Sequence, residues 1–229
     1  MRYILIAIAL IFICSNNIQG QDEEILSADR LFNKGNKAYE DEQFDDAIFY
    51  YERAKLLDPL GEDIATNLNL ANERLSTDII ELDPFFLIFW WNVFNGIMLP
   101  GGWKIFSVLC LAMLLLAVYL YFFKNKPRQR VFYMISGILF SLFILSLLAG
   151  NSRVNQIYNS SYVIVVGADQ SLYIGPDEIS EKVKDITGGN KLKILDAIEE
   201  WYKVSAMDSE QGWIKKENVR LLKFGLTDR

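Results

Sequence analysis

Two long apolar runs dominate the pattern of hydrophobic and polar residues along the chain. The first, residues 103–123, has a single charge close to its start, and the second, residues 131–148, has none. A bilayer core is about 30 Å thick and a helix rises about 1.5 Å per residue, so each run is long enough to cross it. The pattern therefore predicts two transmembrane helices over these ranges.

A short basic loop, residues 124–130, joins the two apolar runs. It carries four cations: Lys124, Lys126, Arg128 and Arg130. Clustered Lys and Arg residues beside transmembrane helices remain in the cytoplasm. We therefore expect a cytoplasmic loop, with the N- and C-terminal segments together on the periplasmic face of an inner membrane.

Residues 1–20 have the layout of a secretory signal peptide. Arg2 precedes an apolar run, which is followed by a short polar stretch. We expect cleavage after Gly20, which would export the next segment and agrees with the loop-charge argument. Cys14 offers an alternative as a lipidation site, but the bulky residues Phe12 and Ile13 fit that motif poorly.

Residues 22–83 alternate apolar and charged positions at helical spacing. The small residues Gly35 and Ala47 would let two antiparallel helices approach closely, and Asp58-Pro59 would end the second helix. This stretch resembles a tetratricopeptide repeat, whose 34-residue period would restart at Glu62. Such repeats need about three units for stability. With about one and a half units here, we expect support from an N-terminal extension, a second copy, a partner protein or the membrane surface.

The repeat resemblance implies a concave face that binds a peptide. Five side chains are expected to line it: Phe32, Asn36, Tyr39, Glu40 and Asn67. Asn36 and Asn67 match positions that hydrogen-bond the ligand's main chain in peptide-binding relatives, and we expect Phe32 and Asn36 to affect binding and not folding. Phe32 and Leu70 replace bases that hold a C-terminal carboxylate in such relatives, so a free carboxylate is not expected. The alternative is that Asn67 only orients a contact between helices.

Residues 84–102 are apolar and aromatic but short for a membrane span. The segment includes Asn92 and Asn95 and ends at Pro100-Gly101-Gly102. Trp90 and Trp91 are of a type that prefers the headgroup zone, which predicts a helix lying in the membrane interface. The alternative is a third crossing, which would place the basic loop and one terminal segment on conflicting sides.

Beyond Gly150 the pattern changes to the period of β-strands. Residues 191–195 and 201–205 alternate at period two, and turn residues separate them. Short strands in a segment of this length predict a small closed barrel over residues 155–224. The stretches Trp201-Tyr202-Lys203-Val204 and Gly212-Trp213-Ile214 resemble a bacterial SH3 domain. Tyr173 and Tyr202 are the candidate peptide-binding residues, because Trp201 and Trp213 more often belong to the core of such a barrel.

Charge and composition favour a binding protein. The chain has a net charge of −6, and residues 21–83 hold 17 acids and 6 bases, which argues against nucleic acid as a partner. The absence of histidine removes the commonest metal ligand and general base. Adjacent acids such as Glu199-Glu200 point apart and lack a nucleophile. We therefore expect no enzymatic activity, no metal and no cofactor.

The whole series of segments resembles the BatE family of the Bacteroides aerotolerance (Bat) operon. The resemblance is carried by Tyr50-Tyr51-Glu52-Arg53-Ala54, Leu57-Asp58-Pro59, Phe85-Phe86 and Trp90-Trp91. It implies a multi-domain, non-enzymatic inner-membrane scaffold in oxygen or stress tolerance. The protein partners it implies are von Willebrand factor A-type membrane proteins and a MoxR-type ATPase, and the apolar segments predict membrane lipid as a further partner. The alternative is an envelope sensor that grips peptidoglycan through the SH3-like segment.

Overall fold

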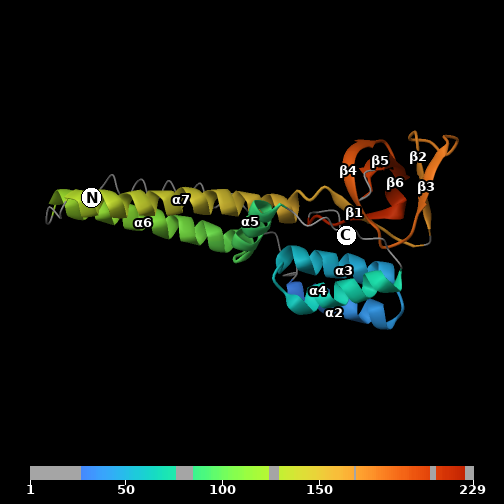
Figure 1. Ribbon diagram of the computed structural model, residues 1–229, viewed down its shortest axis with the longest axis horizontal. Helices are drawn as coiled ribbons and strands as arrows, with labels where there is room; N and C mark the ends of the chain where they lie inside the picture. The colour runs from blue at the N-terminus through green and yellow to red at the C-terminus, as the bar shows by residue number, and fades with distance from the viewer. Residues whose placement is uncertain (1–26, 76–84, 124–128, 168, 207–209, 225–229) are drawn as a thin grey trace.

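The computed structural model describes residues 27–75, 85–123, 129–167, 169–206 and 210–224. Within these ranges the chain forms six α-helices followed by a seven-stranded antiparallel sheet (Figure 1). The prediction of a mixed helical and β protein with two long apolar helices is confirmed. The predicted signal peptide and most of the basic loop lie outside the described residues.

The first three helices form a unit that we call the helical module. They are α2 (Ala28–Glu40), α3 (Phe44–Leu57) and α4 (Glu62–Arg74). The hydroxyl of Ser27 caps α2 by accepting a hydrogen bond from the N–H of Arg30 at 3.2 Å. Helix α3 ends immediately before Asp58-Pro59, where proline prevents the helix from continuing. Helices α2 and α4 begin at Ala28 and Glu62, which are 34 residues apart, as the period of the repeat predicts.

Gly35 allows α2 and α3 to approach closely. A Cβ atom at this position would lie 2.5 Å from Cε1 and 2.6 Å from Cδ1 of the Tyr51 ring. Tyr51 is itself fully buried, with 1% of its surface exposed. A side chain at position 35 would therefore overlap the Tyr51 ring.

We expect Gly35→Ala to lower the free energy of unfolding by about 1–3 kcal/mol, the usual cost of overpacking a core. The added methyl group must displace either the Tyr51 ring or a whole helix. Thermal or urea unfolding of the detergent-solubilised chain measures the change. Gly137→Ala is the matched control, because a Cβ atom on that helical glycine meets nothing within 4 Å. Equal stability of the two variants would contradict the prediction.

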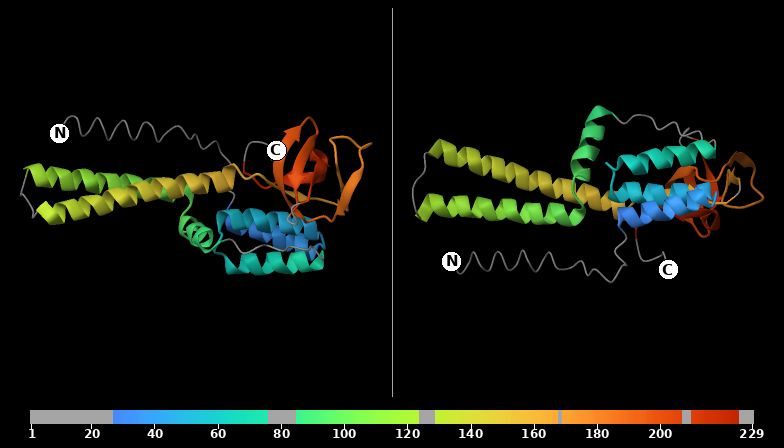
Figure 2. Two further views of the ribbon diagram at one scale, coloured as in Figure 1. Left: turned by 45° about the horizontal axis from the view of Figure 1, so that its top comes forward. Right: turned by 90° about the horizontal axis from the view of Figure 1, so that it is seen from below.

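Three apolar helices follow the helical module. They are α5 (Phe86–Gly96), α6 (Pro100–Phe123) and α7 (Gln129–Tyr158). Helices α6 and α7 are each long and apolar enough to cross a membrane. Only 11% of the most apolar 18-residue stretch of α6, and 6% of that of α7, is buried. Burial this low distinguishes them from core helices of a globular domain. They form an antiparallel hairpin that projects away from α2, α3 and α4, and α5 runs across one end of it (Figure 2).

Two predicted boundaries in this region differ from the structure. Helix α6 begins at Pro100, inside the predicted interfacial segment, because proline is well suited to the first turn of a helix. Helix α7 continues past Leu148 to Tyr158, so the predicted start of the β segment at residue 155 is still helical. Polar residues after Leu148 end the apolar run but not the helix. Ala149, Arg153 and Ile157 are buried at helical spacing, which gives this extension an inner face.

The seven strands form a unit that we call the sheet module. They are β1 (Tyr162–Val165), β2 (Gln170–Tyr173), β3 (Lys182–Ile186), β4 (Lys191–Ile198), β5 (Trp201–Ser205), β6 (Gln211–Lys215) and β7 (Val219–Leu221). Their order is β3-β2-β6-β5-β4-β1-β7, so among the described residues β3 and β7 end the sheet and strand pairing does not close the predicted barrel. Register shifts in β2 and β4 allow the sheet to curl over its own core instead.

The helical and sheet modules share one hydrophobic core. Ile48 and Phe49 of α3 belong to the same buried cluster as Ile164 of β1 and Leu222 after β7. A second cluster joins Leu31 and other helical-module residues to Ile157 of α7 and Phe224. The sheet module and the end of α7 therefore complete the core of the short helical unit. This support differs from the four sources expected from the sequence.

Polar contacts run along the same boundary between the modules. The Glu52 carboxylate lies 2.7 Å from Lys191 Nζ, and Asp46 pairs with Arg220. Asp45 Oδ2 accepts a hydrogen bond from the N–H of Gly167 at 2.7 Å. Three carboxylates on α3 thus face donors that are far away in sequence, and together these contacts fix how the modules are oriented.

Candidate binding sites

A polar pocket of about 220 Å³ opens on the helical module. Six residues line it: Asn36, Tyr39, Glu40, Tyr51, Asn67 and Leu70. Four of them were expected from the sequence to line a binding face, and they come from α2 and α4. Residues 31 positions apart, Asn36 and Asn67, are therefore brought into direct contact by the packing of the two helices.

The floor of the pocket is a hydrogen-bond network that joins three helices. The carboxamide oxygen of Asn36 accepts from the hydroxyl of Tyr51 at 2.8 Å and from the amide of Asn67 at 2.9 Å. Within the described residues, the amide group of Asn36 makes no hydrogen bond, and the carboxamide oxygen of Asn67 makes none either. One donor and one acceptor are thus left beside each other, which is the pair of groups that a peptide unit requires.

Tyr39 and Glu40 shape the electrostatics of the pocket. Burial raises the pKa of the Tyr51 hydroxyl; a hydrogen bond with Asn67 partly offsets this rise, and the Tyr39 and Glu40 side chains add smaller increases. The Glu40 carboxylate is therefore close enough to act on the pocket floor. Arg74 Nε donates a hydrogen bond to the Tyr39 hydroxyl at 3.2 Å, which holds the phenol ring at the edge of the pocket.

Phe32 lies away from the pocket, whereas Asn36 lines it as expected and also joins the helices. Phe32 is absent from the pocket lining; it is half-buried, packs against both shared clusters, and its ring centroid lies 5.8 Å from that of Tyr51. Asn36 lines the pocket but also joins Tyr51 and Asn67, so replacing either Phe32 or Asn36 should affect folding. The prediction that these two residues leave folding unchanged conflicts with this geometry.

Sequence reasoning missed the role of Tyr51 in the pocket and assigned it only to the seam between helices. A buried tyrosine hydroxyl needs a hydrogen-bond partner, and that requirement was a signal that pointed toward a polar neighbour such as Asn36. Leu70, noted in the sequence only as a replacement for a base, forms an apolar wall and is 45% exposed.

The structure separates the two candidate tyrosines of the sheet module. Tyr173 pairs with Trp213 across the strands, and its ring lies 5.7 Å from that of Trp201 in an edge-to-face arrangement. Tyr202 follows Trp201 directly, so it points to the other face of the sheet, where it packs on the module's core. Tyr173 and Tyr202 therefore do not line one groove.

The outer face around Trp201 is covered by the module's own side chains. Trp201 is 8% exposed, and Lys215 lies over its ring at 6.0 Å from the centroid. Lys215 pairs with Glu178 of the β2–β3 loop, and this hydrogen bond raises the lysine pKa. The Lys215–Glu178 pair thus covers the outer face of the Trp201 ring.

Helix α5 is attached to α7 by polar side chains. The indole N–H of Trp91 and the amide of Asn95 donate to Ser152 Oγ at 3.2 and 3.1 Å. Gln156 donates to the carboxamide oxygen of Asn92 at 3.2 Å. The two asparagines of this apolar segment therefore bind the part of α7 that continues past Leu148.

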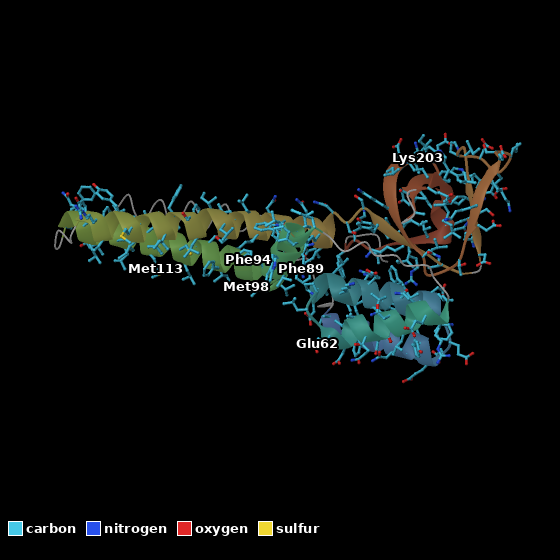
Figure 3. The ribbon with its side chains drawn as sticks, viewed as in Figure 1. Glu62, Phe89, Phe94, Met98, Met113 and Lys203 are labelled. Carbon is cyan, nitrogen blue, oxygen red and sulfur yellow. The ribbon has the colours of Figure 1, made fainter. Side chains whose placement is uncertain are left out.

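The N-terminal part of α5 and the residues after its end form a large exposed apolar surface. Its members are more than one-third exposed: Phe85, Phe86, Leu87, Ile88, Phe89, Trp90, Ile97, Met98 and Leu99. Figure 3 shows Phe89, Phe94 and Met98 together at the end of the hairpin nearest the helical module. No charged residue occurs between Phe85 and Trp103. Such a surface suits the headgroup and upper acyl region of a bilayer.

Comparison with protein-family models and with curated proteins finds no match for this chain. Within the described residues, no group of three or more His, Cys, Asp or Glu side chains is placed to hold a metal ion. The pocket, the two apolar helices and the contact between the modules are therefore the features that bear on function.

Proposed function

We propose that the protein is a membrane-anchored scaffold that binds an extended segment of a protein partner in the pocket of the helical module. The observation that carries the proposal is the pair of groups left available there, the amide of Asn36 and the carboxamide oxygen of Asn67. An extended main chain presents one acceptor and one donor per residue, so it can satisfy both groups. The role is one of binding, without catalysis.

The anchor in this proposal is the α6–α7 hairpin, with α5 lying in the membrane interface. The shared core of the helical and sheet modules supports one location for both, since a continuous core cannot extend across a bilayer. The basic loop supports a cytoplasmic turn, which places both modules in the periplasm at the inner membrane. Lipid is then the second partner, in contact with the apolar surface of α5.

The resemblance to the Bat family provides the first protein partners to test. In this proposal the pocket binds a segment of a von Willebrand factor A-type membrane protein, in a system with a MoxR-type ATPase that serves oxygen or stress tolerance. The helical module acts as a tetratricopeptide-type unit, and the SH3-like sheet module stabilises it and orients its pocket.

We expect Asn67→Ala to reduce recovery of such a partner about tenfold, because the ligand loses its hydrogen bond to the Asn67 oxygen and Asn36 loses the neighbour that orients it, which together cost roughly 1–2 kcal/mol. The tagged full-length chain is cross-linked in its own membranes, purified, and assayed for Bat-type membrane proteins. Asn69→Ala is the control, since Asn69 is exposed on α4 and outside the pocket.

The same variant loses its contact with Asn36, so unfolding must be measured alongside recovery. A stability loss of about 1 kcal/mol is expected from that contact. Equal partner recovery with wild type and Asn67→Ala would refute the pocket as the binding site. Equal loss in Asn69→Ala would show that the effect is not specific to the pocket.

A further inference from the structure

We propose that the pocket selects an internal, positively charged stretch of its partner, with a Lys or Arg side chain placed against Glu40. This inference depends on the proposed function, because it specifies the ligand of that same pocket. It differs from capture of a chain terminus, in which the ligand would carry a carboxylate. The charges around the pocket carry the argument.

Glu40 is the only charged residue that lines the pocket within the described chain. Its side chain makes no ion pair in the part of the chain that the structure describes. It is the last residue of α2, where the helix dipole adds partial negative charge. Asp41 and Glu42 follow directly and are exposed, so the surroundings of Glu40 are acidic.

Arg74 contacts the edge of the pocket through Tyr39, but within the described residues it forms no ion pair with Glu40. Its guanidinium group donates to the Tyr39 hydroxyl, and this hydrogen bond is the largest cause of the raised arginine pKa, with smaller contributions from Glu42 and Glu73. The Glu40 carboxylate is therefore available to a cation that arrives with the ligand.

The acids of α3 have a different use. Asp46 and Glu52 pair with cations of the sheet module, and Asp45 binds a backbone N–H there. The three acids of α3 thus have partners at the interface between the modules, whereas Glu40 in the pocket has no ion-pair partner among the described residues. A ligand carboxylate would meet Glu40 with no Lys or Arg among the lining residues, so a free C-terminus is disfavoured.

The test selects a displayed library of random heptapeptides, blocked at their C-termini by fusion, on the full-length chain in detergent micelles. Lys and Arg should be enriched about two- to fivefold at one peptide position, the range that an exposed ion pair provides. The enrichment should vanish with Glu40→Gln while peptides are still recovered. Glu62→Gln, which changes an exposed acid of α4 outside the pocket, is the matched control.

Each outcome decides between the two proposals. Recovered peptides with no Lys or Arg enrichment, or with enrichment that survives Glu40→Gln, overturn the charge preference and leave the scaffold proposal standing. Recovery that does not change with Asn67→Ala, or no recovery at all, overturns both. Enrichment lost equally in Glu62→Gln assigns the effect to the overall charge of the module and overturns the role of Glu40.

Discussion

Phe49→Ala should lower the free energy of unfolding by about 3–5 kcal/mol, the usual cost of removing a buried phenylalanine. Phe49 is 2% exposed and lies in the cluster shared by the helical and sheet modules. The Arg220 guanidinium stands 3.9 Å from its ring centroid, and the Arg53 guanidinium stands 5.4 Å from the same point. Arg53 in turn lies 4.4 Å from the ring centroid of Phe224.

The substitution therefore removes more than one apolar side chain. Arg53 is 7% exposed, and without the ring of Phe49 its charge loses one of the two aromatic faces that contact it. Arg220 loses its closest aromatic contact while keeping its pair with Asp46. Because the two modules share this core, we expect both to lose stability together in one cooperative transition.

Urea unfolding of the full-length chain in detergent, followed by circular dichroism, measures this effect. Leu60→Ala is the control, because Leu60 belongs to the same module but is 50% exposed, and it should change stability by no more than about 0.5 kcal/mol. A loss below 1 kcal/mol for Phe49→Ala, or a separate early transition of the helical module in the wild-type chain, would contradict the shared core.

Local patterns in the sequence were sufficient to predict the helical and apolar segments. Helical spacing, Asp58-Pro59 and the restart at Glu62 mark α2, α3 and α4 closely, because each signal acts within a few residues. Period-two alternation likewise predicted β4 and β5. Four of the five expected pocket residues meet in one place because they follow from helical periodicity and the repeat resemblance.

Contacts between distant segments could not be predicted in this way. Nothing near Glu52 or Asp45 indicates that their partners are Lys191 and Gly167, since those pairs depend on how the modules pack. The extension of α7 was missed because its polar residues, judged by hydropathy, resemble the end of a membrane span. Arg153 illustrates this point. The residue is 2% exposed and its guanidinium donates to the carbonyl of Leu57, so this polar side chain makes a buried contact instead of facing solvent.

Exposed residues of the helical and sheet modules should react with a membrane-impermeant reagent from the same side of the membrane. The shared core and the three polar contacts of α3 require one aqueous compartment, so the chain between Leu75 and Tyr162 must cross the bilayer an even number of times. Helix α5, with 11 residues, spans only about 16 Å, whereas α6 and α7 span about 36 and 45 Å. Two crossings by α6 and α7 give an even number and use helices long enough to span the bilayer. A third crossing by α5 would give an odd number and use a helix that is too short.

The measurement uses single-cysteine variants in a chain whose Cys14 and Cys110 are replaced by alanine. Asn69→Cys on α4 and Lys193→Cys on β4 introduce thiols at exposed positions of the two modules. Both should be labelled by an impermeant maleimide once the outer envelope is opened, and Arg130→Cys only after the inner membrane is permeabilised. Labelling of the two modules from opposite sides would rule out the shared core in the membrane-bound protein. Labelling of Arg130→Cys alone would preserve the even number of crossings and reverse the orientation deduced from the basic loop.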